Sequence, residues 1–287
     1  MKRTALRNLS FAALAGSALV FASCDKSNDA PATTPDIAVS AEDQGLAEDE
    51  TAAVADLVDA AAPTDVAVSG SPAAADADDL SRVAGRCVTR TYDAPTRTLT
   101  LDFGTVNCMG PNGVARRGKI VTVFSGPYRQ TGATKTITLV DYYRNDNRHT
   151  GTRLLTNLGA GSWSLDVQNA SITTPAGTHS WAAQRTYTRT AGLNTRTIAD
   201  DEYSITGQAS GTNRKGAGYT ATIGQPLLKK FQPGCARTFV AGTVKIVTSK
   251  QKELLLNYDP TGTQACDNIA SITVNGVTRT IRVGRGL

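Results

Sequence analysis

The sequence predicts an all-β fold for residues 86–287, and three features of this stretch point to it. Threonine, which favours strands, supplies 34 of its 202 residues. Short runs of alternating apolar and polar residues recur between turn signals, which is typical of half-buried strands. No connection shows a helical pattern of about 10–15 residues, so parallel strand pairs are not expected. We therefore expect an antiparallel meander of about 12–15 strands that forms a curved sheet, a sandwich or a half-barrel.

The expected strands follow one another closely along the chain. The clearest alternating runs cover residues 98–103, 119–124, 135–143, 163–167, 203–206, 243–247, 253–258, 271–274 and 277–283. Asn275 and Gly276 separate the last two runs and predict a tight hairpin, because both turn positions need a positive φ. Further turns are expected at 145–147, 175–177 and 213–216.

Residues 1–23 have the layout of a secretory signal peptide. Three bases in the first seven residues precede an apolar run that is too short to cross a bilayer as a permanent helix. The sequence FASC at 21–24 resembles the bacterial lipobox, in which the cysteine is acylated and becomes the first residue of the mature protein. The alternative is an ordinary signal peptide followed by an unrelated cysteine. We expect acyl chains on Cys24 to anchor the protein in a membrane.

Residues 25–85 have the composition of a flexible acidic tether. They contain no aromatic residue, and their 14 acids and two bases give a net charge of −12. Such a stretch buries too little apolar surface to offset its chain entropy. One short helix is expected near 46–62, ending before Pro63, because five apolar residues share one helical face: Leu46, Val54, Leu57, Val58 and Ala61. The predicted organisation is a signal peptide over 1–23, an acylated cysteine and tether over 24–85, and an all-β domain over 86–287.

Four cysteines remain besides Cys24, namely Cys87, Cys108, Cys235 and Cys266. An even number in an exported chain predicts two disulfides, for which three connectivities exist. Residues 99–108 and 254–266 are similar strand–loop–cysteine segments, and each has a further cysteine upstream. This similarity favours Cys87–Cys108 and Cys235–Cys266. Free buried thiols and a metal site are the alternatives, although the chain has no Cys-x-x-Cys and only two histidines.

The folded part contains few groups that suit catalysis. It has no nucleophile elbow, phosphate-binding loop, dinucleotide fingerprint or zinc-protease motif. We expect His149 and His179 to lie in surface turns or strands rather than to act as bases. The acidic run 200–202 has ligands that Ca²⁺ prefers, but a solvated turn is the simpler interpretation. The sequence therefore predicts no enzymatic activity, no cofactor and no bound metal.

A surplus of bases distinguishes residues 86–287, which carry 25 bases and 11 acids, a net charge of +14. Strand alternation places Arg185 and Arg189 on one face. Guanidinium groups suit phosphates and carboxylates, so envelope polyanions are candidate ligands, while specific nucleic-acid recognition is not expected. The alternative is that the charge serves solubility and is offset by the acidic tether. The candidate polyanion-binding residues are Arg116, Arg117, Lys119, Arg185, Arg189, Arg279 and Arg282.

Several segments of the folded part together carry a family resemblance. They are LTLDFG from Leu99 with the cysteine that follows it, GPNGVARRGKI at 110–120, DYYRNDNRHTGTR at 141–153, DDEYSITGQASGTNRKGAGY at 200–219 and ACDNIASITVNGVTRTIRV at 265–283. In these the chain resembles a large group of uncharacterised lipoproteins from Bacteroidota. The resemblance implies an outer-membrane lipoprotein that faces the cell surface or the periplasm, and it implies no activity.

These observations predict a lipid-anchored β module of the cell envelope that acts without catalysis, by binding an envelope component or another protein, or as a structural element. Two alternatives stay open. A curved half-barrel could carry an apolar ligand if its inward positions are consistently apolar. A glycan hydrolase would need a polar cleft with two carboxylates about 5–10 Å apart.

Overall fold

The computed structural model describes residues 35–63, 77–128, 130–195, 199–232, 235 and 239–283. All of them belong to one compact unit that covers residues 32–287. The predicted signal peptide and Cys24 lie outside the described residues.

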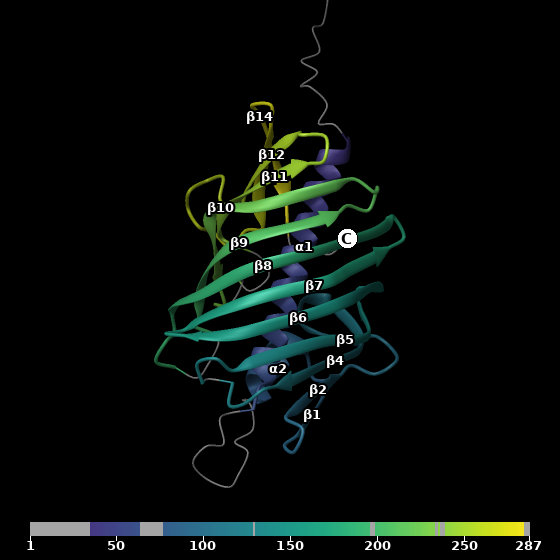
Figure 1. The fold of residues 1–287 in the computed structure, drawn as a ribbon, viewed down its shortest axis with the longest axis vertical. Coiled ribbons are helices and arrows are strands. Elements are labelled where there is room, and N and C mark those ends of the chain that lie inside the picture. The colour runs from purple at the N-terminus through teal and green to yellow at the C-terminus, as the bar shows by residue number, and fades with distance from the viewer. Residues whose placement is uncertain are drawn as a thin grey trace, which may run out of the picture. The chain divides into compact units, whose positions relative to one another are not determined.

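Fourteen antiparallel strands form one sheet, which confirms the predicted meander (Figure 1). Apart from the short β3, which pairs with β4, the strands lie in the sheet in the order in which they occur along the chain. The order begins at β1 and ends at β14, so the sheet is open. The strands are β1 (Thr89–Asp93), β2 (Thr98–Asp102), β3 (Cys108–Met109), β4 (Ala115–Phe124), β5 (Thr134–Arg144), β6 (Asn147–Gly159), β7 (Ser162–Thr174), β8 (Gly177–Ala191), β9 (Glu202–Thr212), β10 (Gly218–Lys230), β11 (Ala241–Thr248), β12 (Glu253–Asn257), β13 (Ile269–Val274) and β14 (Val277–Arg282).

The predicted turns connect these strands. Asn275 and Gly276 have φ values of 50° and 79° and join β13 to β14, as a tight hairpin requires. The other three predicted turns join β5 to β6, β7 to β8 and β9 to β10. A short 3₁₀ helix, η1 (Pro111–Gly113), lies between β3 and β4.

Bulges bend the sheet. Register shifts interrupt the pairing of β4 with β5, of β5 with β6 and of β6 with β7. At the last of these, Gly151 has a φ of 108°, and a Cβ there would lie 2.5 Å from the Cα of Ala170. No larger residue fits this close approach without a shift of the backbone. Because bulges increase the local twist and bend the strand, they curve the sheet.

Residues 25–85, which were expected to form a flexible tether, contain two helices. For the residues of these helices the expectation of a flexible chain is wrong. Helix α1 spans Pro35–Ala61 and α2 spans Ala77–Ala84. The helix expected near 46–62 exists, but it begins eleven residues earlier and has 27 residues, a length of about 40 Å. It ends before Pro63 as predicted, and the Nε of Arg90 donates a 2.7 Å hydrogen bond to the carbonyl oxygen of Ala61 at its end.

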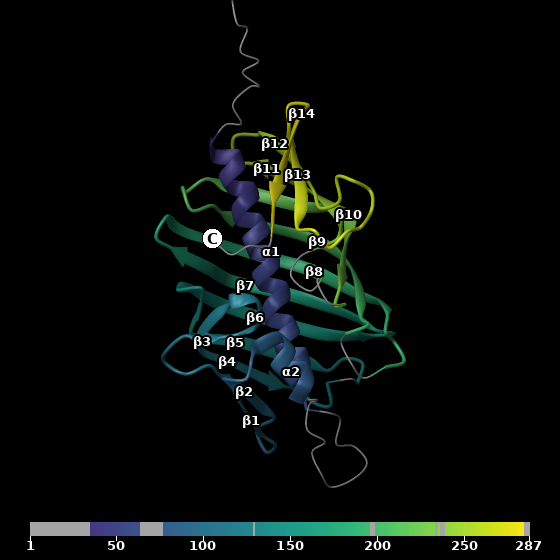
Figure 2. The ribbon, with the colours of Figure 1, turned by 180° about the vertical axis from the view of Figure 1, so that it is seen from behind.

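Helix α1 lies along one face of the sheet, which we call the inner face (Figure 2). Val54, Leu57 and Val58 from the predicted apolar face of α1 are fully buried in the core together with inward-facing strand residues. The polar side of the helix is covered as well. Among the α1 side chains that the structure describes, only Glu42 is classed as exposed. The core of the molecule therefore lies between the sheet and a helix that is covered along most of its length.

Candidate functional site

Ion pairs join α1 to the inner face of the sheet. Seven acids of α1 have described side chains, and each of them pairs with a base from the sheet or its turns. The pairs join Glu42 and Asp43 to Arg214, Glu48 to Arg185, Asp49 to Arg144, Glu50 to Arg144, His149 and Arg153, Asp56 to Lys229, and Asp59 to Lys135. Acids of residues 25–85 therefore pair with bases of residues 86–287 within the fold.

The bases reach α1 because they occupy inward positions of their strands. Arg153 of β6 is 0 % exposed and Lys135 of β5 is 1 % exposed, and both alternate with outward residues in the same way as the neighbouring Leu155 and Ile137. A buried charge without a partner costs several kcal/mol, so such positions require opposite charges nearby. The sequence prediction missed Lys135 and Arg153. Both are bases at strand positions where the alternation predicts an inward apolar residue, and this pattern indicates an acidic partner enclosed by the sheet.

Glu50 is the centre of the densest part of this network. Its carboxylate lies 3.4 Å from Nη1 of Arg144, 3.2 Å from Nδ1 of His149 and 3.9 Å from Nη2 of Arg153. Burial alone would raise the pKa of Glu50, but the close contact with His149 and the charges of Arg144 and Arg153 outweigh it and lower the pKa to about 2. Glu50 is therefore an anion at neutral pH, and it acts as a structural counter-ion.

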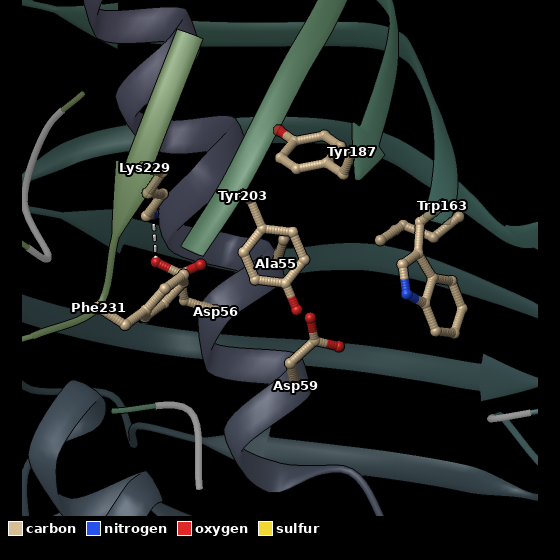
Figure 3. Close-up of a pocket in the computed structure, with 9 residues that line it drawn as sticks. Ala55, Asp56, Asp59, Trp163, Tyr187, Tyr203, Lys229 and Phe231 are labelled. Atoms are coloured by element: carbon tan, nitrogen blue, oxygen red, sulfur yellow. Dashed lines mark hydrogen bonds and ion pairs between the residues drawn. The ribbon is translucent and has the colours of Figure 1, made fainter. Parts of the chain in front are cut away.

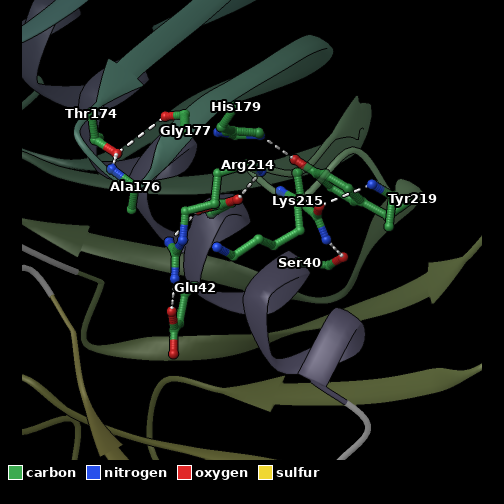
Figure 4. Close-up of polar contacts among 12 residues, drawn as sticks. Ser40, Glu42, Thr174, Ala176, Gly177, His179, Arg214, Lys215 and Tyr219 are labelled. Carbon is green, nitrogen blue, oxygen red and sulfur yellow. Dashed lines mark hydrogen bonds and ion pairs between the residues drawn. The ribbon is translucent and has the colours of Figure 1, made fainter.

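At the other end of α1, Arg214 in the turn between β9 and β10 binds two acids of the helix (Figure 4). Its backbone N–H donates to Oδ2 of Asp43 at 2.7 Å, and its guanidinium reaches Oδ1 at 2.5 Å. The neighbouring Asn213 donates to Oγ of Ser40 at 2.9 Å. Burial nevertheless raises the pKa of Asp43 above its usual value, because these bonds compensate it only in part.

Both histidines are buried strand residues, so the expectation that they lie at the surface was wrong. His179 of β8 stacks on Trp181 with ring centroids 5.0 Å apart, and its Nε2 lies 2.7 Å from the hydroxyl oxygen of Tyr219 (Figure 4). Burial, aided by the charge of Arg214, lowers the pKa of His179 to about 4. His149 faces Glu50. Both rings therefore serve in internal contacts.

A small cavity lies beside the C-terminal half of α1 (Figure 3). Its volume is about 30 Å³, which is room for about one water molecule. Burial raises the pKa of Asp56 to about 6, although the carboxylate is 2.5 Å from Nζ of Lys229. The cavity, called the aromatic cavity below, is lined by Ala55, Asp56, Asp59, Leu155, Trp163, Tyr187, Tyr203, Lys229 and Phe231.

The candidate polyanion-binding residues do not gather on one surface. Arg185 and Arg189 do share the inner face of β8, but Arg185 pairs with Glu48, and Arg189 pairs with Asp201. Arg116 is 5 % exposed. Of the other four, Arg117 pairs with Asp146, and Lys119 pairs with Asp102 at 2.9 Å. Arg279 and Arg282 are exposed on β14. Only the two arginines of β14 remain as predicted, and polyanion binding stays a prediction.

The cysteines pair as the internal similarity predicted. Cys87 bonds to Cys108 and Cys235 to Cys266, with Cα atoms 5.7 Å and 4.7 Å apart. The alternatives of free thiols and a metal site are thereby excluded for these four residues.

The acidic run 200–202 is not a uniformly solvated turn. Asp201 is 4 % exposed and binds Arg189, while Asp200 is exposed. Burial raises the pKa of Asp201 to about 6 despite Arg189. Glu202 of the same run lies 3.8 Å from Nζ of Lys230, so two of its three acids form ion pairs with bases of the sheet.

The face of the sheet that points away from α1, the outer face, is hollowed over β6–β10. The hollow has a volume of about 720 Å³. We call it the outer hollow, and it is lined by Leu154, Thr156, Ser164, Leu165, Asp166, Gln184, Arg185, Thr186, Gly207, Gln208, Thr222 and Ile223. Gln184 and Gln208 are exposed, whereas Leu165 and the guanidinium of Arg185 are buried toward α1. The outward side chains of this hollow are the open polar groups that a ligand can reach.

Searches of the described residues found neither a metal-binding group nor a membrane span. No cluster of three or more His, Cys, Asp or Glu side chains that suits a metal ion occurs within the described ranges. No helix in the same ranges is both long and apolar enough to cross a membrane. Comparison of the chain with family models, curated proteins and solved structures found no match.

Proposed function

We propose that this protein is a lipid-anchored, non-enzymatic module of the cell envelope that binds its ligand on the outer face of the sheet. The observation that supports this proposal most is that α1 already fills the inner face through its ion pairs, while the outer hollow of about 720 Å³ stays open. Ligand sites are concave and carry a few polar groups that fix the orientation of the ligand, and the outer hollow has both features.

The anchor in this proposal is Cys24, and the membrane is the outer membrane, with the module facing the cell surface or the periplasm. The lipobox-like FASC and the resemblance to outer-membrane lipoproteins support this assignment. Eleven residue steps separate Cys24 from the start of α1, a distance of at most about 40 Å when fully extended. The binding module therefore stays close to the membrane surface, much closer than a tether of 61 residues would allow.

The aromatic cavity does not favour the carrier or the hydrolase. A cavity of about 30 Å³ has no room for an apolar ligand or a sugar ring. Asp56 and Asp59 are close carboxylates with an aromatic surround, as a glycan hydrolase would need, but each forms an ion pair with a lysine. These two acids hold α1 in place, and the same contacts keep them from acting as a free acid and base.

A pull-down with a blocked hollow tests the proposal. The chain from Asp25 onward is immobilised and exposed to outer-membrane, peptidoglycan and lipopolysaccharide fractions. We expect one fraction to be retained, and we expect Thr186→Arg to abolish the retention because it fills the outer hollow. Ser180→Arg, on the same face of β8 but outside the hollow, should bind as the wild type does. Equal retention by both variants, or no retention of any fraction by the wild type, would contradict the proposal.

A further inference from the structure

Apart from Arg185, which binds Glu48, the polar side chains that line the outer hollow have no hydrogen-bond or ion-pair partner within the described ranges. They comprise four hydroxyls, two amides and one carboxylate, from Thr156, Ser164, Thr186, Thr222, Gln184, Gln208 and Asp166. Elsewhere on the sheet such side chains do bond to each other, as Thr150 does with Ser171 at 2.7 Å and Thr173 with Thr178 at 3.1 Å. The donors and acceptors of the hollow are free to bind a ligand.

Strand register arranges these groups in rows. Asp166 lies opposite Gln184, Gln184 opposite Gln208, and Gln208 opposite Thr222, so that one row crosses β7, β8, β9 and β10. Three strand spacings make this row about 14 Å long. A second row beside it joins Thr156, Ser164 and Thr186 across β6, β7 and β8. The two rows form an extended strip of polar groups, most of which can both donate and accept hydrogen bonds, and its length matches a linear ligand.

The charge of the hollow selects the ligand class. Asp166 is the only ionised side chain that points outward among its lining residues, because the guanidinium of Arg185 is bound to Glu48 on the inner side. A surface without free bases does not attract a polyanion. Leu154, which is 38 % exposed and lies opposite Asp166, adds an apolar contact at one end of the row. An uncharged ligand rich in hydroxyl groups fits this combination.

We infer that the outer hollow binds a neutral glycan chain, with the amides of Gln184 and Gln208 and the carboxylate of Asp166 as its main hydrogen-bonding groups. The inference rests on the proposed function and gives its site a ligand class. A carboxylate accepts two hydrogen bonds from adjacent sugar hydroxyls, and an amide both donates and accepts, so the row satisfies hydroxyl groups of either orientation. Leu154, which is exposed beside Asp166, offers an apolar contact to the C–H face of a sugar ring.

Affinity electrophoresis tests this inference with the chain from Asp25 onward. The protein is run in native gels that contain dextran, mannan or galactomannan, and in gels that contain heparin as the anionic comparison. We expect at least one of the three neutral polysaccharides to retard the wild type, and heparin to retard it less. Gln184→Ala combined with Gln208→Ala should weaken the binding about thirtyfold, because about 1 kcal/mol is lost at each of the two amides.

Gln168→Ala is the matched control, since this glutamine is exposed on β7 but does not line the hollow. It should be retarded as the wild type is. The inference is overturned if none of the neutral polysaccharides retards the wild type, if heparin alone does so, or if the double variant behaves as the control does. Retention of an envelope fraction that depends on the hollow, together with any of these results, would leave the proposed function standing and remove only the glycan as its ligand.

Discussion

Glu48 of α1 and Arg185 of β8 form a buried, two-pronged ion pair between residues 137 positions apart in the sequence. Their side chains are 3 % and 1 % exposed, and Gln44, one turn earlier in α1, donates a further hydrogen bond of 2.5 Å to Glu48. Arg185 also donates to the carbonyl oxygen of Gln184 at 3.1 Å. Neither charge can reach water while α1 is in place, so each depends on the other.

Replacing Glu48 should therefore strongly lower the stability of the fold. We expect Glu48→Gln to lower the free energy of unfolding by about 3–5 kcal/mol, because Arg185 stays buried without a counter-charge. The measurement is urea unfolding followed by the fluorescence of Trp163 and Trp181. Glu42→Gln is the matched control: Glu42 pairs with Arg214 but is 53 % exposed, and its loss should change the free energy by less than about 1 kcal/mol. Similar losses for the two variants would show that Glu48 is not enclosed.

The low pKa of Glu50 makes its contribution depend on pH. The folded-state pKa of about 2 lies below the ordinary value of 4.5, so this carboxylate stabilises the fold above pH 4.5 and loses that effect as the pH falls toward 2. The shift corresponds to about 3 kcal/mol at neutral pH. We expect Glu50→Gln to be destabilising by about this amount at pH 7 and by much less near pH 2.5. A difference of the same size at both values would refute the assignment.

The two disulfides close two separate segments of the chain. Cys87–Cys108 and Cys235–Cys266 close segments with sequence separations of 21 and 31 residues. We expect each double Cys→Ala variant to lose about 3 kcal/mol in the chain-entropy account. Peptide mapping without reductant should recover these two linked pairs from protein taken from the cell envelope. Finding four free thiols there would contradict the structure.

Acylation of Cys24 is the prediction on which the proposed location depends. Radiolabelled palmitate should enter the wild type and the Cys87→Ala, Cys108→Ala variant alike, because neither of those cysteines follows a lipobox-like sequence. Cys24→Ser should carry no label. Equal labelling of Cys24→Ser would remove the lipid anchor from the proposal.

Local patterns were sufficient to predict the class of the sheet and part of its strands. Alternation located parts of β4, β5, β7 and β9 but none of the long strands β6, β8 and β10, while turn residues such as Asn275 and Gly276 located hairpins, because both signals depend only on neighbours in sequence. The outer hollow could not be foreseen, because it depends on how four or more strands align their outward residues. The register that aligns several strands cannot be deduced from the sequence of any single strand.

The helix α1 was underestimated for a different reason. Its acids, such as Glu48 and Asp56, make an isolated segment look disordered, and the prediction weighed the segment alone. The bases that stabilise it are distant in sequence: Arg185 lies 137 positions from Glu48, and Lys229 lies 173 positions from Asp56. The near-equal and opposite charges of the two regions, and the bases at inward strand positions, were the available signals. The prediction took the acidic tether as an offset to the charge of the β domain, whereas in the structure acids of α1 pack against bases of the sheet.

Hydrogen exchange along α1 tests most directly whether the acidic helix is enclosed by the sheet. Mass spectrometry of the chain from Asp25 onward, after labelling in deuterated buffer, resolves peptides from residues 40–61 and from β7. We predict that the amides of 40–61 exchange as slowly as those of β7, because both belong to the same buried core. Complete exchange of 40–61 at the shortest labelling time, with β7 still protected, would contradict the account.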